Sequence, residues 1–323
     1  MWFMRQAGRY MADYRALRQR YSLLQICAHP ELAVAVTLQP VDLIEVDAAI
    51  LFSDLLLPFA PMGLAFDFVK GEGPSVEHPI RCASDVERVH VVEPREALGH
   101  VLETIGLLRR ELEHKVPLVG FGGAPFTMAA YAIEGGPSTT YARTKAFMFS
   151  QPAAWHTLCD RFATVMANYL VAQVEAGAQA IQVFDSWAGQ LSRADYREYA
   201  LPHTKRIFDA LAGTGVPTIH FGVNTAAILA EMKAAGGDAI GIDWRMPLDE
   251  AWRVIGHDRA VQGNLDPTRL LGPEHGLFAA TDDVLRRAAG RPGHIFNLGH
   301  GVLPDTPLER VQALARHVHA YRA

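Results

Sequence analysis

Two arginines near the start of the chain have a spacing that suits the binding of an anion. Arg5 and Arg9 flank the short segment Gln6, Ala7 and Gly8. On a helix the two arginines would share a solvated face, but Gly8 and the apolar run before the loop argue against a helix here. A guanidinium group binds a carboxylate through two parallel hydrogen bonds. We therefore expect a tight loop that directs Arg5 and Arg9 toward one carboxylate-binding site.

Further polar residues follow short apolar runs that are typical of strands. They are Ser53, Asp54, the segment 122–125, Asp185, Ser186, His220, Asp243, Asn264, Asn297 and His300. In a parallel α/β barrel the carboxyl ends of the strands meet at one rim, which carries the active site. The pattern therefore predicts a functional rim.

Several of these residues also have a structural explanation. Asp54 could cap the turn that follows it. For Asp185 and Asp243 we favour hydrogen bonds to neighbouring loop amides. His220 is equally consistent with a ligand contact and with an ordinary histidine bonded inside the barrel.

His300 and Tyr131 are the remaining candidates. Gly299 and Gly301 on either side of His300 let the backbone approach a ligand closely, and Tyr131 lies in the segment after the third apolar run. The sequence has no nucleophile elbow, P-loop, HExxH motif or convincing Schiff-base lysine. These residue types predict a barrel enzyme acting on a small molecule that bears carboxylates or phosphates, without need of a bound cofactor.

Eight apolar runs supply the strands that must position these residues. They span residues 2–6, 48–52, 117–121, 180–184, 217–221, 239–243, 260–265 and 294–298. They lack the alternation of half-exposed strands, and segments with apolar residues three and four apart separate them, notably 98–112, 155–174, 225–235, 248–255 and 307–321. We expect a single (β/α)₈ TIM barrel with its active site at the C-terminal rim of the strands. A doubly wound sheet is less favoured because no GxGxxG opens a helix.

Composition limits the function classes. The 323 residues carry a net charge of −5, which argues against nucleic-acid and anionic-membrane partners. Three widely spaced cysteines, no leader-like start and no long apolar run indicate a cytoplasmic protein. We expect one domain over residues 1–323, with an insertion at 58–79 that holds a small hairpin near 65–70.

Seven motifs resemble those of the uroporphyrinogen decarboxylase family, in the family's order. They are WFMRQAGRY at 2–10, ILFSD at 50–54, GFGGAPFTMAAYAIEGG at 120–136, FDSWAG at 184–189, HFGVN at 220–224, QGNLDP at 262–267 and FNLGHGVLP at 296–304. The resemblance implies a homodimeric (β/α)₈ barrel that uses no metal and no prosthetic group. It implies the conversion of the four acetate side chains of uroporphyrinogen III into methyl groups, giving coproporphyrinogen III and CO₂.

The resemblance also implies roles for single residues. Arg5 and Arg9 correspond to the substrate-binding arginines, with Gln6, Ala7 and Gly8 in the same loop, and Asp54 corresponds to the carboxylate that receives the pyrrole N–H groups. Tyr131, Ser186 and His300 correspond to the remaining substrate contacts. Asp54, Arg5, Arg9 and Tyr131 form the implied catalytic set.

Two other functions are considered. A zinc-dependent, corrinoid-linked methyltransferase shares the barrel, but it needs an HxC pair and a later cysteine, whereas Gly222 follows His220 by two and no cysteine follows Cys159. A non-catalytic porphyrinogen-binding protein would be expected to lose Asp54, Tyr131 or an arginine. Family members usually carry further residues before the arginine loop, so we expect either an earlier start codon or a short first strand.

Overall fold

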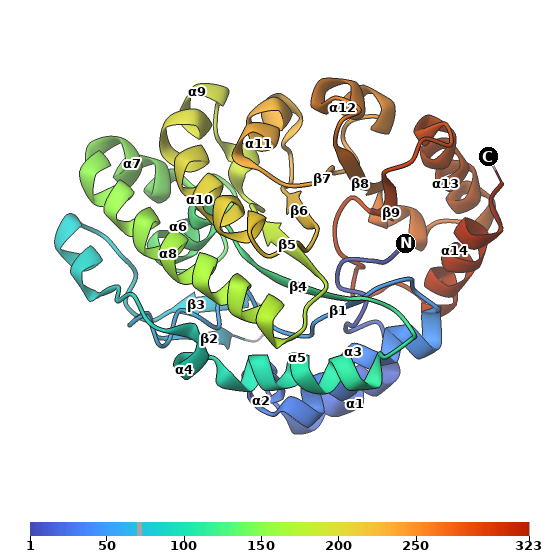
Figure 1. Ribbon diagram of the computed structural model, residues 1–323, viewed down its shortest axis with the longest axis horizontal. Helices are drawn as coiled ribbons and strands as arrows, with labels where there is room; N and C mark the ends of the chain where they lie inside the picture. The colour runs from blue at the N-terminus through green and yellow to red at the C-terminus, as the bar shows by residue number, and fades with distance from the viewer. Residues whose placement is uncertain (70–72, 323) are drawn as a thin grey trace.

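Seven parallel strands form one curled sheet in the computed structural model, which describes residues 1–69 and 73–322. Their order is β1 (Ala49–Ile50), β4 (Leu118–Gly123), β5 (Ala180–Phe184), β6 (Thr218–Phe221), β7 (Ala239–Gly241), β8 (Ala260–Leu265) and β9 (His294–Leu298). Figure 1 shows the strands at the centre with helices around them. The predicted parallel α/β architecture is confirmed for this sheet. The three strands β5, β8 and β9 have the predicted bounds.

The helices occupy the segments between the strands. They are α1 (Ala12–Arg20), α2 (Leu23–Ala28), α3 (Pro30–Ile44), α4 (Pro94–Ala97), α5 (Gly99–Glu111), α6 (Pro125–Glu134), α7 (Ala142–Ser150), α8 (Pro152–Ala176), α9 (Arg193–Asp195), α10 (Leu201–Ala212), α11 (Leu229–Ala235), α12 (Leu248–Ile255), α13 (Glu274–Ala288) and α14 (Leu308–Ala320). Shorter turns are the 3₁₀ segments η1 (Ala83–Arg88), η2 (Ala188–Gln190), η4 (Ala226–Ile228) and η5 (Pro267–Leu271), and the π-helical turn η3 (Tyr196–Ala200). In the described part of the chain, no helix combines the length and apolar character that crossing a bilayer requires.

The segment 2–6, predicted as the first of eight strands, is not a strand. It lies between β9 and β1, but the Trp2 amide makes one long backbone bond to Phe296, at 3.4 Å, and Met1 accepts one from Asp47, at 2.8 Å. Side chains replace the missing ladder: Asn297 Oδ1 accepts from the Met4 amide at 3.1 Å. The prediction of an eighth strand is wrong for this reason.

Side chains on the inner face of the sheet form a small core of their own. Trp2 and Met4 pack there with residues from all seven strands of the sheet, and no helix residue joins them. A polar chain crosses this core, in which Trp2 Nε1 donates to Gln262 at 3.0 Å and Gln262 donates to Gln182 at 2.8 Å. The first segment therefore fills the inside of the curled sheet although it is not a ladder strand.

The outer face packs on the helices, where glycines bring helix and sheet together. A Cβ at Gly122 of β4 would lie 2.5 Å from Met166 Cε of α8, so the methionine packs directly on the glycine backbone and would have to shift for any side chain here. The helix begins with Pro152 and ends at Gly177, whose φ of 122° terminates it. These contacts fix β4 and the loop after it.

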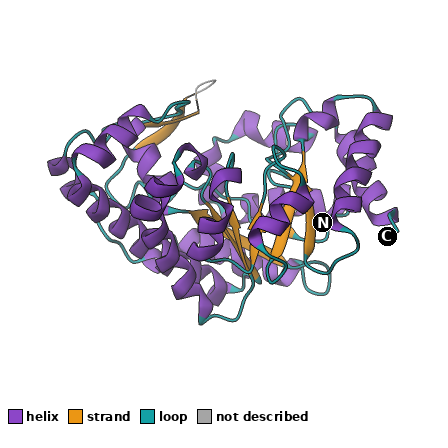
Figure 2. Ribbon diagram, turned by 90° about the horizontal axis from the view of Figure 1, so that it is seen from above, coloured by secondary structure: helices purple, strands orange, loops and turns teal. Residues whose placement is uncertain are grey.

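The predicted insertion is a two-stranded antiparallel hairpin apart from the main sheet. Strands β2 (Phe66–Val69) and β3 (Gly73–Val76) pair from Phe66–Val76 to Val69–Gly73. Figure 2 shows the hairpin at one end of the molecule. The hairpin is confirmed but extends beyond the predicted 65–70, and Lys70 lies outside the described residues.

Candidate active site

A buried glutamine shapes the loop that carries the two arginines. The Gln6 side chain accepts from the Phe3 amide at 3.1 Å and donates to the Ala48 carbonyl at 3.1 Å. Arg5 adopts the left-handed conformation, with φ of 57°, so the chain turns without forming a helix, as predicted. Gln6 is fully buried, whereas Arg5 and Arg9 are exposed. The Gln6 side chain thus holds the loop in place from its buried side.

Arg5 lies against the loop that follows β9. A Cβ at Gly301 would lie 2.5 Å from Arg5 Cδ, so only glycine leaves the space that the Arg5 side chain occupies. The Gly301 amide donates to Nδ1 of His300 at 2.7 Å. This bond leaves Nε2 of a neutral His300 imidazole as the hydrogen-bond donor for a ligand.

His300 is held neutral by its surroundings. Burial, together with the positive charges of Arg5 and Arg245, lowers its pKa to about 4, although the negative charge of Asp243 acts in the opposite direction. The imidazole therefore serves as an uncharged hydrogen-bond donor near neutral pH.

Asp54 follows β1 and caps its turn, as the structural explanation predicts. Its Oδ1 accepts from the Leu56 amide at 2.9 Å. Among the described residues, no donor bonds to Oδ2, so this oxygen can accept from a ligand. Removal from bulk water raises the Asp54 pKa, and the Leu56 bond and the Arg5 charge partly offset this effect.

Tyr131 on α6 lies near enough to Asp54 and Arg5 for both charges to affect its pKa. Burial raises its pKa to about 12; the negative charge of Asp54 also raises it, and the positive charge of Arg5 lowers it. Tyr131 therefore remains a phenol near both charges. Its ring meets that of Trp187 edge-on, with centroids 5.9 Å apart, and Ser186, directly before Trp187, is partly exposed.

Other predicted rim residues serve the fold. Asp243 accepts from the Arg245 and Asn224 amides and pairs with the Arg245 guanidinium at 2.6 Å, as the structural explanation predicts. Asp185 is also structural, but its partners are the Thr127 and Tyr196 hydroxyls and not loop amides.

The His220 side chain points to the outer, helix-covered face of the sheet and not into the barrel. Of the two alternatives for His220, a bond inside the barrel is wrong, because Nδ1 lies 3.2 Å from the Met232 and Gly236 carbonyls on the helix side, and full burial there does not favour a ligand contact. On a strand, alternate side chains face opposite ways. Ile219 and Phe221, its neighbours on β6, occupy the inner face.

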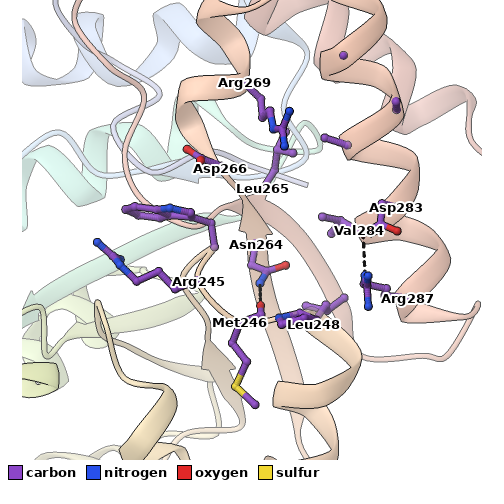
Figure 3. A pocket seen from close by; sticks show the side chains of 15 residues that line it. Arg245, Met246, Leu248, Asn264, Leu265, Asp266, Arg269, Asp283, Val284 and Arg287 are labelled. Atoms are coloured by element: carbon purple, nitrogen blue, oxygen red, sulfur yellow. Dashed lines mark hydrogen bonds and ion pairs between the residues drawn. The ribbon is translucent and has the colours of Figure 1, made fainter.

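A cavity of about 630 Å³ lies at the loop after β7. Figure 3 shows it between this loop, β8 and α13, with Arg245, Arg269 and Arg287 among its lining residues. The Arg245 guanidinium lies 4.0 Å from the Trp244 ring centroid. None of the nine predicted site residues lines this cavity. In the sequence, Arg245 could have been found as a candidate rim residue because the polar run Asp243–Arg245 follows an apolar strand.

The donor set does not fit a metal site. No group of three or more histidine, cysteine, aspartate or glutamate side chains in residues 1–69 and 73–322 could hold a metal ion. His220 is fully buried on the helix side. The zinc-dependent alternative therefore gains no support.

Solved structures share this fold. A methyltransferase from Methanosarcina mazei has a TM-score of 0.78 at 23% identity, covering 91% of this chain and 86% of its own. A putative vitamin-B12-independent methionine synthase from Listeria monocytogenes has a TM-score of 0.61 at 12% identity, covering 98% and 94%. At these identities the likeness is one of fold alone.

Sequence relatives are far closer. Uroporphyrinogen decarboxylase of Sorangium cellulosum is 55% identical over 320 residues, covering 99% of this chain and 91% of the relative. That of Carboxydothermus hydrogenoformans is 54% identical over 319 residues, with the same coverage. The model of the family described as uroporphyrinogen decarboxylase matches residues 1–321. Since the match spans nearly the whole chain and these relatives are named for the decarboxylase, the chain belongs to the uroporphyrinogen decarboxylase family.

Proposed function

We propose that the cluster of Arg5, Asp54, Tyr131 and His300 is the site at which this enzyme decarboxylates uroporphyrinogen III to coproporphyrinogen III. The observation that carries the proposal is that Arg5 lies against the loop that holds His300, and that its positive charge lowers the pKa of Asp54, Tyr131 and His300, although the four residues come from distant parts of the sequence. A cation, a carboxylate and two neutral donors around one point suit a ligand with both carboxylates and N–H groups.

The residue types match the difficulty of the reaction. Loss of CO₂ from a pyrrole acetate leaves an electron pair that the electron-rich ring cannot accept. Protonation of a ring carbon first produces a cationic ring, which takes up the pair as the carbon–carboxylate bond breaks. A proton then adds to the resulting methylene carbon and the ring proton leaves, giving a methyl group. No bound cofactor is needed, because the protonated ring is the electron sink.

Asp54 suits stabilisation of that cation. Its Oδ1 is held by the Leu56 amide, so the carboxylate is already oriented before substrate binds. We propose that Oδ2 accepts from the pyrrole N–H groups and stabilises the positive charge as it develops. Preorganised charge of this kind is commonly the largest contribution to catalysis.

The other residues bind the anionic side chains. We propose that Arg5 and Arg9 bind substrate carboxylates, with the half-buried Ala7 and Gly8 between them, and that His300 donates from Nε2. Tyr131 and Ser186 contribute hydroxyl groups from the opposite side. With the other carboxylates bound by these residues, the acetate side chain that loses CO₂ would lie near Asp54.

Incubation of the pure protein with uroporphyrinogen III under anaerobic conditions tests the proposal. We expect hepta-, hexa- and pentacarboxylate intermediates to appear in turn before coproporphyrinogen III. Samples are oxidised to porphyrins and separated by chromatography to measure each species. Bound porphyrinogen without any product at stoichiometric enzyme would instead establish a binding protein.

We further propose a cytoplasmic homodimer in which the segment 2–6 completes a (β/α)₈ barrel. The backbone bond from Trp2 to Phe296 of β9, and the bond from Asp47, before β1, to the preceding residue Met1, support the closure. The free thiols of Cys27, Cys82 and Cys159 suit a reducing compartment.

A further inference from the structure

A buried hydroxyl on α6 ties the helix to the turn after β5. Thr127 is fully buried; its Oγ1 donates to Asp185 Oδ1 at 3.4 Å and accepts from the Trp187 amide at 3.3 Å. The Thr127 hydroxyl thus bonds both to Asp185, which directly follows β5, and to Trp187 in the turn. Thr127 was not among the predicted site residues.

Asp185 is the fixed point to which Thr127 is attached. The carboxylate is fully buried, its Oδ2 accepts from the Tyr196 hydroxyl at 3.2 Å, and His220 Nε2 lies 3.6 Å from the same oxygen. Burial and the Asp185 charge raise the Tyr196 pKa well above its ordinary value, so Tyr196 stays a donor. The backbone of Asp185 bonds to Phe221 of β6 at 2.7 Å. Asp185 is therefore held from β6 and from η3.

The link between Thr127 and the turn after β5 also involves the candidate catalytic residue Tyr131. Thr127 and Tyr131 are four residues apart on α6 and share one face of the helix. Thr127 holds the Trp187 amide, and Tyr131 meets the Trp187 ring. Helix α6 and the turn are thereby joined at two successive points, one polar and one aromatic.

We propose that Thr127 and Asp185 are positioning residues that set the place of Tyr131 relative to Ser186. This inference rests on the proposed function of the cluster. Neither residue is exposed to a ligand, so both act through Tyr131 and the turn. A misplacement of about 1 Å can cost on the order of 100-fold in rate.

The test compares Thr127→Val, which keeps the shape but loses the hydroxyl, with Thr127→Ser, which keeps the hydroxyl. We expect Thr127→Val to lower kcat for uroporphyrinogen III by about tenfold or more with little change in KM, since positioning errors act on the reacting geometry. We expect Thr127→Ser to restore most of kcat. Thr281→Val is the matched control, because Thr281 is also a fully buried helical threonine, and its hydroxyl donates to the Leu277 carbonyl of its own helix, α13.

Thermal unfolding of each variant separates a loss of stability from a loss of position. Equal kcat in Thr127→Val and wild type, or equal losses of kcat in Thr127→Val and Thr281→Val, would overturn the inference. Trp187→Phe keeps the backbone bond and reduces the ring contact with Tyr131. It is the second arm if Thr127→Val does not fold: we expect reduced kcat, and unchanged kcat contradicts the inference. Wild-type protein without activity would refute the proposed function itself, which is a distinguishable result.

Discussion

At the scale of single residues, Asp54 uses the two oxygens of one carboxyl group differently. Oδ1 is bonded to the Leu56 amide, whereas Oδ2 is left for a ligand. The structural and functional explanations of this residue are therefore compatible. The turn cap orients the carboxylate, and partial burial raises its pKa.

Asp54→Asn tests the charge while keeping the cap. The asparagine oxygen can still accept from Leu56, so we expect the melting temperature to change little while turnover of uroporphyrinogen III falls by about 100-fold or more. Asp266→Asn is the matched control, because Asp266 follows β8 and caps the Thr268 amide in the same way, at 2.9 Å. Wild-type turnover in Asp54→Asn with porphyrinogen bound would remove Asp54 from the mechanism.

Gly301→Ala tests the placement of Arg5. The new methyl group would occupy the space of the Arg5 side chain, so we expect a raised KM for uroporphyrinogen III with a smaller change in stability. Gly106→Ala is the control, because no atom lies within 4 Å of a Cβ at this helical position. It should be neutral or stabilise by up to about 1 kcal/mol. An unchanged KM in Gly301→Ala argues against a substrate contact of Arg5.

His300 predicts a pH dependence of stability. Its pKa is about 4 in the fold against an ordinary 6.5, so the unfolded chain takes up a proton at a higher pH than the folded chain. The free energy of unfolding should therefore fall as pH falls from about 6.5 toward 4, by about 1.4 kcal/mol for each unit of pKa difference.

Urea unfolding of wild type and His300→Asn at pH 7 and pH 4.5 measures this contribution. Asparagine can accept the Gly301 bond but does not titrate, so the wild type should lose more stability than the variant between these two values. Equal losses would show that His300 is not buried in its neutral form.

At the scale of elements, the first segment shows how side chains can replace a strand ladder. Gln6 and Asn297 satisfy backbone groups at Phe3, Ala48 and Met4 that a neighbouring strand would otherwise bond. The segment is therefore anchored at discrete points. Since Arg5 follows it directly, these anchors also determine where the guanidinium lies.

Gln6→Met should expose this dependence. Methionine has similar volume but leaves the Phe3 amide and the Ala48 carbonyl without these partners, which should destabilise the fold by about 2–4 kcal/mol. We expect a lower midpoint in urea and a raised KM through misplaced Arg5. Gln312→Met is the control: it removes one exposed bond to the Leu43 carbonyl and should cost less than about 1 kcal/mol. Comparable losses in both variants would contradict the anchoring role.

At the scale of the whole molecule, the local distribution of charge, and not the net charge, determines whether an anionic ligand can bind. The chain is acidic overall, yet Arg5 and Arg9 are both exposed on one loop beside the candidate site. Binding of an octacarboxylate requires cations where the ligand sits, because surface charges more than about 10 Å away are largely screened at physiological salt.

Sedimentation equilibrium tests the proposed homodimer. We expect a mass twice the 35.4 kDa of one chain, retained on dilution to the concentrations of the activity assay. A single 35.4 kDa species with full activity would show that one chain holds the complete site.

Much of this molecule could be predicted from the sequence, because apolar runs covered on both faces identify parallel strands wherever they lie. The strands β5, β8 and β9 have the predicted bounds, and Asp54, Ser186 and His300 follow strands as expected. Local chemistry also decided the loop at Gly8 and the cap at Asp54. These features depend on residues within a few positions of one another.

Only the tertiary structure decided which polar residues the fold itself uses. Gln6 bonds to Ala48, Asp185 to Thr127, and His220 to the helix side of the sheet, and each partner comes from another element. A strand pattern does not distinguish its two faces when both are buried, and a polar residue does not reveal its distant partner. Thr127, an unremarked helical residue in the sequence, acquires its place beside Trp187 and Asp185 only through packing of α6 against the turn after β5.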